Sequence, residues 1–137
     1  NLIRDFIPEH HGTNTMTFFY KKALRNAGEK EINEADFKYP GPKPQSKETG
    51  IAMLADAVEA ATRSLTNPTP SKLRAFVEEL VDKRFKDGQL DECDLTLRDL
   101  KNIIDSFMPV LYGVFQHRIE YPDQEKKNPK PVNNKKS

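Results

Sequence analysis

The sequence predicts an all-helical fold in a single domain. Apolar residues recur at steps of three and four along four segments, which is the spacing of one face of an α-helix. Residues that favour helix ends bound each segment, and no stretch alternates convincingly in the manner of a strand. The chain has 137 residues and is 36% apolar, enough for one modest core. We expect helices near 14–27, 47–65, 70–86 and 97–118.

The first expected helix, 14–27, has Thr13 as its predicted N-cap and Gly28 as its C-terminal stop. Its apolar residues share one face and are Met16, Phe19, Tyr20, Ala23, Leu24 and Ala27. The segment 29–45 that follows contains glycine and several prolines, which forbid regular structure over most of it. We therefore expect an ordered proline-rich loop, anchored to the domain by Phe37 and Tyr39.

The helix expected at 47–65 is capped by Ser46 and carries a stripe that should face the core. The stripe comprises Ile51, Leu54, Ala55, Val58, Ala61 and Leu65. The opposite side is unusually apolar for a surface helix and comprises Ala52, Met53, Asp56, Ala57 and Ala60. This helix should therefore be covered on most sides. A carboxylate such as Asp56 then needs a cationic partner, hydrogen bonds or a metal, and the ion pair and the metal both remain open.

The last two expected helices have clear start signals. Thr69 is the predicted N-cap of 70–86, with Pro70 at its first position, and Thr96 and Asp99 resemble a capping box ahead of 97–118. Pro109 lies inside the last helix and should kink it. Between the two helices stands the chain's one cysteine, Cys93, which excludes an internal disulfide and which we interpret as a small packed residue.

The candidate chemistry begins at His10 and His11, which lie between a proline and a glycine on a tight connection ahead of a helix. Imidazole is the commonest metal ligand in proteins, and a loop can direct two adjacent rings at one small volume. A surface turn holding two polar residues is the alternative. Together with Asp56, the pair forms part of a mixed imidazole and carboxylate site, which suits iron, manganese, zinc or cobalt. His117 is more typical of a surface residue or a helix-terminal cation.

The net charge of +1 is unevenly spread along the chain. The segment 123–137 carries five lysines against two acidic residues, which leaves the body mildly acidic and argues against a nucleic-acid partner. We expect 123–137 to be a flexible basic tail after a domain at 1–122. No apolar run is long enough to span a bilayer, so this stretch should be soluble. The first residue is Asn1, so we expect part of a longer protein.

Five segments together resemble one known family. They are IPEHHGTNTM, FKYPGPKPQSKETGI, MLADAVEAATRSL, DGQLDECDLTLRDL and RIEYP, and they extend over nearly the whole chain up to Pro122. They are similar to the C-terminal part of the HD domain in the seven-transmembrane-HD family, the membrane-anchored cyclic-di-AMP phosphodiesterases of bacteria. HD-GYP phosphodiesterases also have a double histidine and a distant aspartate, but the Gly-Tyr-Pro segment that names them is absent after the pair.

The resemblance implies a two-metal hydrolase centre of iron or manganese on the cytoplasmic side of the bacterial membrane. His10 and His11 would bind one metal and Asp56 the other, and the enzyme would convert cyclic-di-AMP to the linear dinucleotide. For the substrate, the resemblance and the positions in the chain suggest Tyr39 beside a base, Lys47 beside a phosphate, and Thr13 as a further contact.

The family's site also takes an earlier histidine, a His-Asp dipeptide and a further histidine, none of which this sequence supplies. We therefore expect the chain to be the back half of a catalytic domain, inactive alone, whose partners are the upstream half of that domain and the membrane segments. Its alanine-lined face could also support self-association. The alternative is a non-catalytic helical module, regulatory or partner-binding, with an incomplete metal site.

Overall fold

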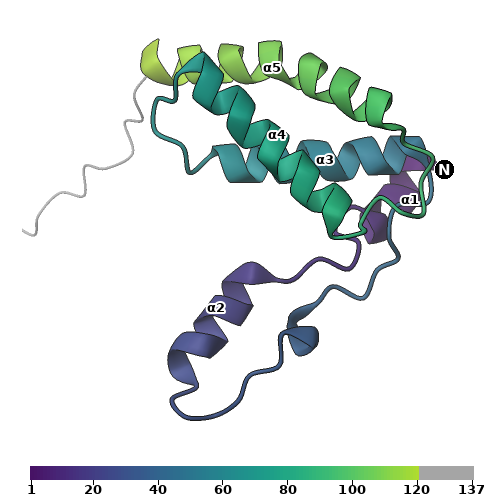
Figure 1. The fold of residues 1–137 in the computed structure, drawn as a ribbon, viewed down its shortest axis with the longest axis vertical. Helices are drawn as coiled ribbons and strands as arrows, with labels where there is room; N and C mark the ends of the chain where they lie inside the picture. Colours follow the sequence, from purple (N-terminus) through teal and green to yellow (C-terminus); the bar gives the residue numbers. More distant parts are fainter. Residues whose placement is uncertain (121–137) are drawn as a thin grey trace, which may run out of the picture.

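The computed structural model describes residues 1–120, so the expected tail at 123–137 lies outside the described residues. The described chain is all-helical, as predicted (Figure 1). Its only pairing of extended backbone is an isolated bridge between Thr15 and Lys38. The elements in chain order are α1 (Leu2–Glu9), α2 (Thr17–Asn26), the 3-10 helix η1 (Glu34–Phe37), α3 (Lys47–Thr62), α4 (Pro70–Lys86) and α5 (Leu97–Glu120).

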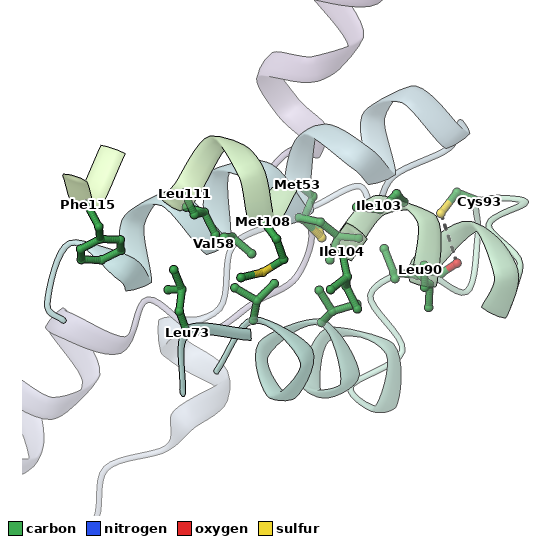
Figure 2. Close-up of a cluster of buried hydrophobic side chains, with 14 residues drawn as sticks. Met53, Val58, Leu73, Leu90, Cys93, Ile103, Ile104, Met108, Leu111 and Phe115 are labelled. Atoms are coloured by element: carbon green, nitrogen blue, oxygen red, sulfur yellow. Dashed lines mark hydrogen bonds between the residues drawn. The ribbon is translucent and has the colours of Figure 1, made fainter. Parts of the chain in front are cut away.

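The core lies between α3, α4 and α5, with α1 packed against α3 (Figure 1). Figure 2 shows side chains from α3, α4, α5 and the segment that joins α4 to α5 meeting in one apolar cluster. Its members are Met53, Leu54, Val58, Leu73, Val77, Val81, Leu90, Cys93, Leu100, Ile103, Ile104, Met108, Leu111 and Phe115. Cys93 is buried as predicted, its Sγ donates to the Leu90 carbonyl at 3.3 Å, and burial raises the pKa of this thiol.

The predicted start signals of the last two helices are confirmed. The Thr69 hydroxyl accepts a hydrogen bond from the Lys72 N–H, and Pro70 occupies the first turn of α4. At α5 the capping box is reciprocal, because the Thr96 N–H donates to the Asp99 carboxylate at 2.9 Å and the Asp99 N–H donates to the Thr96 hydroxyl at 3.1 Å. The bond from the Thr96 N–H to the carboxylate, and after it the bond from the Lys47 ammonium, lower the pKa of Asp99. Ser46 caps α3, as expected, in a box with Thr49.

The beginning of the chain differs from the expectation. Residues that should only lead into the histidine pair form α1, whose first turn is capped by the Asn1 side chain. Pro8 lies inside this helix. Thr13 does not cap α2, which begins four residues later after Met16 without a side-chain cap. The reason is that Thr13 uses its N–H and its hydroxyl to bind Gln89 instead.

The apolar face of α2 is not packed on the core, and no residue of this helix is buried. Phe18 is 67% exposed and meets Phe19 edge to face, with ring centroids 5.4 Å apart. Figure 1 shows α2 and η1 forming an arm that extends away from the other helices. Within the arm the Tyr20 ring lies against the Phe37 ring, with centroids 5.7 Å apart, so Phe37 anchors the loop to α2 rather than to the core.

The expected core stripe of α3 is confirmed at Leu54 and Val58, which are buried, but not at its first residue. Ile51, expected in the core, is 38% exposed, whereas Met53, expected on the opposite face, is only 1% exposed. The turn that follows α1 lies against Met53 and covers it, so the buried face of α3 is rotated toward that residue. Among residues 1–120, no helix is both long enough and apolar enough to cross a lipid bilayer.

The core predicts a contrast between two leucines. Leu73 is buried in the core from the first turn of α4, so Leu73→Ala should lower the free energy of unfolding by about 2–5 kcal/mol through lost burial and the cavity left behind. Leu97 is exposed at the start of α5, and the same change there should alter stability by no more than about 0.5 kcal/mol. Urea unfolding followed by circular dichroism measures both, and equal losses would contradict the assignment of the core.

Candidate metal centre

Two elements bring the predicted metal ligands together. His10 and His11 end α1, and Asp56 lies on α3, against which α1 packs. One ligand atom from each of the three side chains lies within 4.8 Å of the others. The packing of α1 on α3 therefore brings the histidine pair close to the aspartate, although they are far apart in sequence. The three side chains can face one small volume.

The backbone of α1 fixes the orientation of His10. Its Nδ1 lies 2.8 Å from the Ile7 carbonyl oxygen and 3.1 Å from that of Phe6. A carbonyl only accepts hydrogen bonds, so Nδ1 must carry the proton. The lone pair is then on Nε2, on the far side of the ring, which is the arrangement that a metal-binding histidine adopts when its other nitrogen donates to the main chain.

His11 lies between two rings. Its centroid is 3.8 Å from that of His10 and 4.2 Å from that of Tyr39, whose ring stacks on it at an interplanar angle of 15°. Burial, and secondarily the neighbouring His10, lowers the pKa of His11, while Asp56 opposes the shift. The lowered pKa favours the neutral imidazole, which is the form that binds a metal.

Asp56 is exposed rather than covered. Within residues 1–120, no lysine or arginine forms a salt bridge with it. The ion pair that the sequence left open as an alternative is therefore not present in the described chain. With two imidazoles and one carboxylate, the donor set suits a divalent transition metal, although three side chains fill only part of a coordination shell.

Two buried side chains that the sequence did not single out hold the backbone around the pair: Gln89 binds the turn after it, and Glu9 ties the end of α1 to the segment ahead of α3. The Gln89 amide, located just past α4, binds Thr13 through both its oxygen and its nitrogen. Glu9 is buried at the end of α1, and its carboxylate accepts the Gln45 N–H at 3.0 Å. Neither residue has a sequence signal of its own, because a glutamine after a helix and a glutamate within one are usually solvated. The positive φ of Gly12, +54°, is compatible with the predicted tight turn.

Of the three residues predicted to contact substrate, two lie beside the histidine pair and one does not. Tyr39 lies against His11, and Thr13 adjoins the histidine pair but has its N–H and hydroxyl engaged by Gln89. Lys47 is not brought to the cluster. It lies about two and a half helical turns before Asp56 on α3, which places it on the opposite face, and its ammonium pairs with Asp99 at 3.2 Å.

An all-helical fold with two histidines at one helix end and a facing aspartate matches part of an HD domain. Two solved structures support this assignment: the HD domain of the Listeria monocytogenes phosphodiesterase PgpH, and the same domain in complex with cyclic-di-AMP. Both are 42% identical to this chain, with TM-scores of 0.70 and 0.72. The first match covers 81% of this chain and 50% of the solved one, and the second covers 80% and 50%.

Two relatives of this chain are named cyclic-di-AMP phosphodiesterase PgpH, and the predicted resemblance to the C-terminal part of an HD domain is confirmed. The protein of that name from Bacillus subtilis is 46% identical over 123 residues, which are 90% of this chain. The chain spans only 17% of the length of that relative. No family model matches the chain.

The turn predicts a contrast between two glycines with similar backbone angles. A Cβ at Gly12 would lie 2.5 Å from the Gln89 Oε1 and 2.7 Å from the Met53 Cε, whereas a Cβ at Gly28, at φ +59°, would meet nothing within 4 Å. Gly28→Ala should therefore cost only the backbone strain, about 1 kcal/mol, and Gly12→Ala should cost about 1–3 kcal/mol more. Urea unfolding measures both, and equal losses would show that the turn is not tightly packed.

Proposed function

We propose that this chain supplies one side of a metal-dependent phosphodiesterase site that hydrolyses cyclic-di-AMP to the linear dinucleotide. The observation that carries the proposal is the convergence of His10, His11 and Asp56 within a chain similar to the PgpH HD domain. The solved relative in complex with cyclic-di-AMP supports the choice of substrate. The proposal concerns the whole enzyme, of which this chain would form one part.

In this site the residues of the chain bind and orient. His10 presents Nε2, because its Nδ1 proton is held by the α1 carbonyls. Burial lowers the pKa of His11, which favours its neutral form, and the ring is stacked between His10 and Tyr39. Asp56 adds a negative charge from α3. Two divalent ions, iron or manganese, would neutralise phosphate oxygens and activate water when bound there, with His10 and His11 on one ion and Asp56 on the other.

The substrate contacts follow from the same geometry. Tyr39 is already stacked on a ligand histidine, so an adenine base beside the site could extend that stack. The N–H and the hydroxyl of Thr13 are already hydrogen-bonded to Gln89, so Thr13 would contact substrate only through its remaining atoms. Lys47 is the weakest of the three contacts, because Asp99 already binds its ammonium on the other face of α3. The remaining metal ligands and the membrane anchor would belong to the upstream part of the protein, with the site on the cytoplasmic side.

The ligand roles predict the behaviour of variants of the whole enzyme. His10→Ala, His11→Ala and Asp56→Ala should each reduce cyclic-di-AMP turnover by at least a hundredfold and deplete bound metal, because each would remove a ligand atom that neighbouring groups cannot replace. Helicity should change little. Turnover and metal content per chain measure the effect.

His117→Gln is the matched control, since this histidine lies on α5 and does not join the cluster. It should keep both turnover and metal. If the triple variant at His10, His11 and Asp56 kept full turnover and full metal, the result would favour the alternative that this chain is a non-catalytic helical module. The exposed apolar face of α2 is the observation that supports this alternative.

The chain alone should show little or no cyclic-di-AMP turnover and bind transition metals weakly. Its cluster offers three side-chain donors, whereas two ions held ~3.5–4 Å apart need about twice that number from the protein. The measurement loads the chain with manganese or ferrous iron under reducing conditions and compares its turnover with that of a complete HD domain. Comparable turnover, with two tightly bound ions per chain, would show that this donor count is wrong.

A further inference from the structure

We propose that Gln89 is a positioning residue that fixes the direction of the His10–His11 pair relative to Asp56. The inference rests on the proposed metal site and adds to it a residue that contacts neither metal nor substrate. Gln89 is 76 residues distant from Thr13 in sequence, within the segment that joins α4 to α5. It is only 5% exposed, which is unusual for glutamine.

Gln89 binds the turn at two points. Its Oε1 accepts the Thr13 N–H at 3.0 Å, and its Nε2 donates to the Thr13 hydroxyl at 3.1 Å. The backbone N–H can only donate, so the amide has one possible orientation, with its oxygen toward the main chain. A residue with only one of these two groups could not make the same pair of bonds.

Packing reinforces the hydrogen bonds. Gly12 lies so close to its neighbours that a Cβ on the glycine would be 2.5 Å from the Gln89 Oε1 and 2.7 Å from the Met53 Cε. The turn is therefore packed closely against α3 and the Gln89 side chain. Movement away from them would break both bonds and leave a part-buried N–H and a buried amide without partners, which is costly.

The histidine pair is consequently held from both sides in the chain. On its N-terminal side, the Phe6 and Ile7 carbonyls hold the His10 ring. On its C-terminal side, the buried Gln89 side chain forms two hydrogen bonds with Thr13, which follows His11 by two residues. Asp56 belongs to α3, whose core-facing residues pack against α4 and α5. Gln89 thus ties the part of the site that carries the imidazoles to the part that carries the carboxylate.

The experiment separates positioning from general stability. Gln89→Leu removes both hydrogen bonds at similar volume, and Gln89→Glu retains an acceptor for the Thr13 N–H. Leu90→Ala is the control, because Leu90 is the next residue, is buried in the core and would be cut to a smaller side chain. The readouts are the imidazole nitrogen signals of His10 and His11 in the metal-free chain, the zinc affinity followed through those signals, and urea unfolding.

Gln89→Leu should shift both imidazole signals and weaken zinc binding by up to about tenfold, the lower end of the effect of losing a direct partner of a metal ligand, because Gln89 acts one step further out through Thr13. Gln89→Glu should recover part of that loss. Leu90→Ala should lower stability while leaving the imidazole signals and the zinc affinity as they are in the original chain. If the imidazole signals and the zinc affinity of Gln89→Leu are the same as those of Leu90→Ala, the proposal is overturned.

Two further variants distinguish failure of the metal site from failure of the role proposed for Gln89. If the original chain binds zinc no better than His10→Ala, the metal site itself fails, and the imidazole signals of the metal-free chain then decide the role of Gln89 alone. If Gln89→Leu does not fold, Thr13→Val replaces it, since this change removes the hydroxyl partner and keeps the N–H bond. Thr13→Val should shift the imidazole signals in the same direction, and unchanged signals would overturn the proposal.

Discussion

The turn at Gly12 lies directly against Met53 and the Gln89 amide, and the geometry of the candidate metal ligands depends on this contact. Helix α1 is short, with eight residues, and a helix of that length is marginal in water by itself. The turn that follows it is held by two hydrogen bonds to Gln89 and packs closely against Met53. The positive φ of Gly12 allows this close approach, and the buried Gln89 amide adds specific hydrogen bonds to it. The position of the two imidazoles thus depends on a residue of α3 and on one in the segment between α4 and α5.

The sequence predicted best where local signals and burial agree. Helix α4 begins at Pro70 with its Thr69 cap and buries Leu73, Val77 and Val81, because its cap, its proline and its apolar spacing all indicate the same helix. Helix α1 was missed because it contains Pro8 and has few residues over which a period can be recognised. The rotation of α3 was missed for another reason: Ile51 and Met53 are equally apolar, and only the neighbouring turn decides which one is covered.

The site was predictable in part. Adjacent histidines and a distant aspartate are visible in the sequence, and the resemblance to a known family suggested that they meet, which the structure shows geometrically. The positions of Lys47 and Gln89 were not predictable in this way. The direction in which a lysine at a helix start points depends on the partner it finds, here Asp99, and the burial of a glutamine depends on a turn far away in sequence. Both depend on tertiary contacts that no local pattern encodes.

The arm formed by α2 and η1 is closed at its base. The Met16 N–H donates to the Phe37 carbonyl at 2.6 Å, and the Tyr39 N–H donates to the Asn14 carbonyl at 2.9 Å, so the two strands of chain that enter and leave the arm lie side by side. A segment whose ends are already joined changes its closure entropy only slowly with its length. The arm is therefore a place where insertions and deletions can accumulate between related proteins, while the stacking of Tyr39 on His11 at its base is preserved.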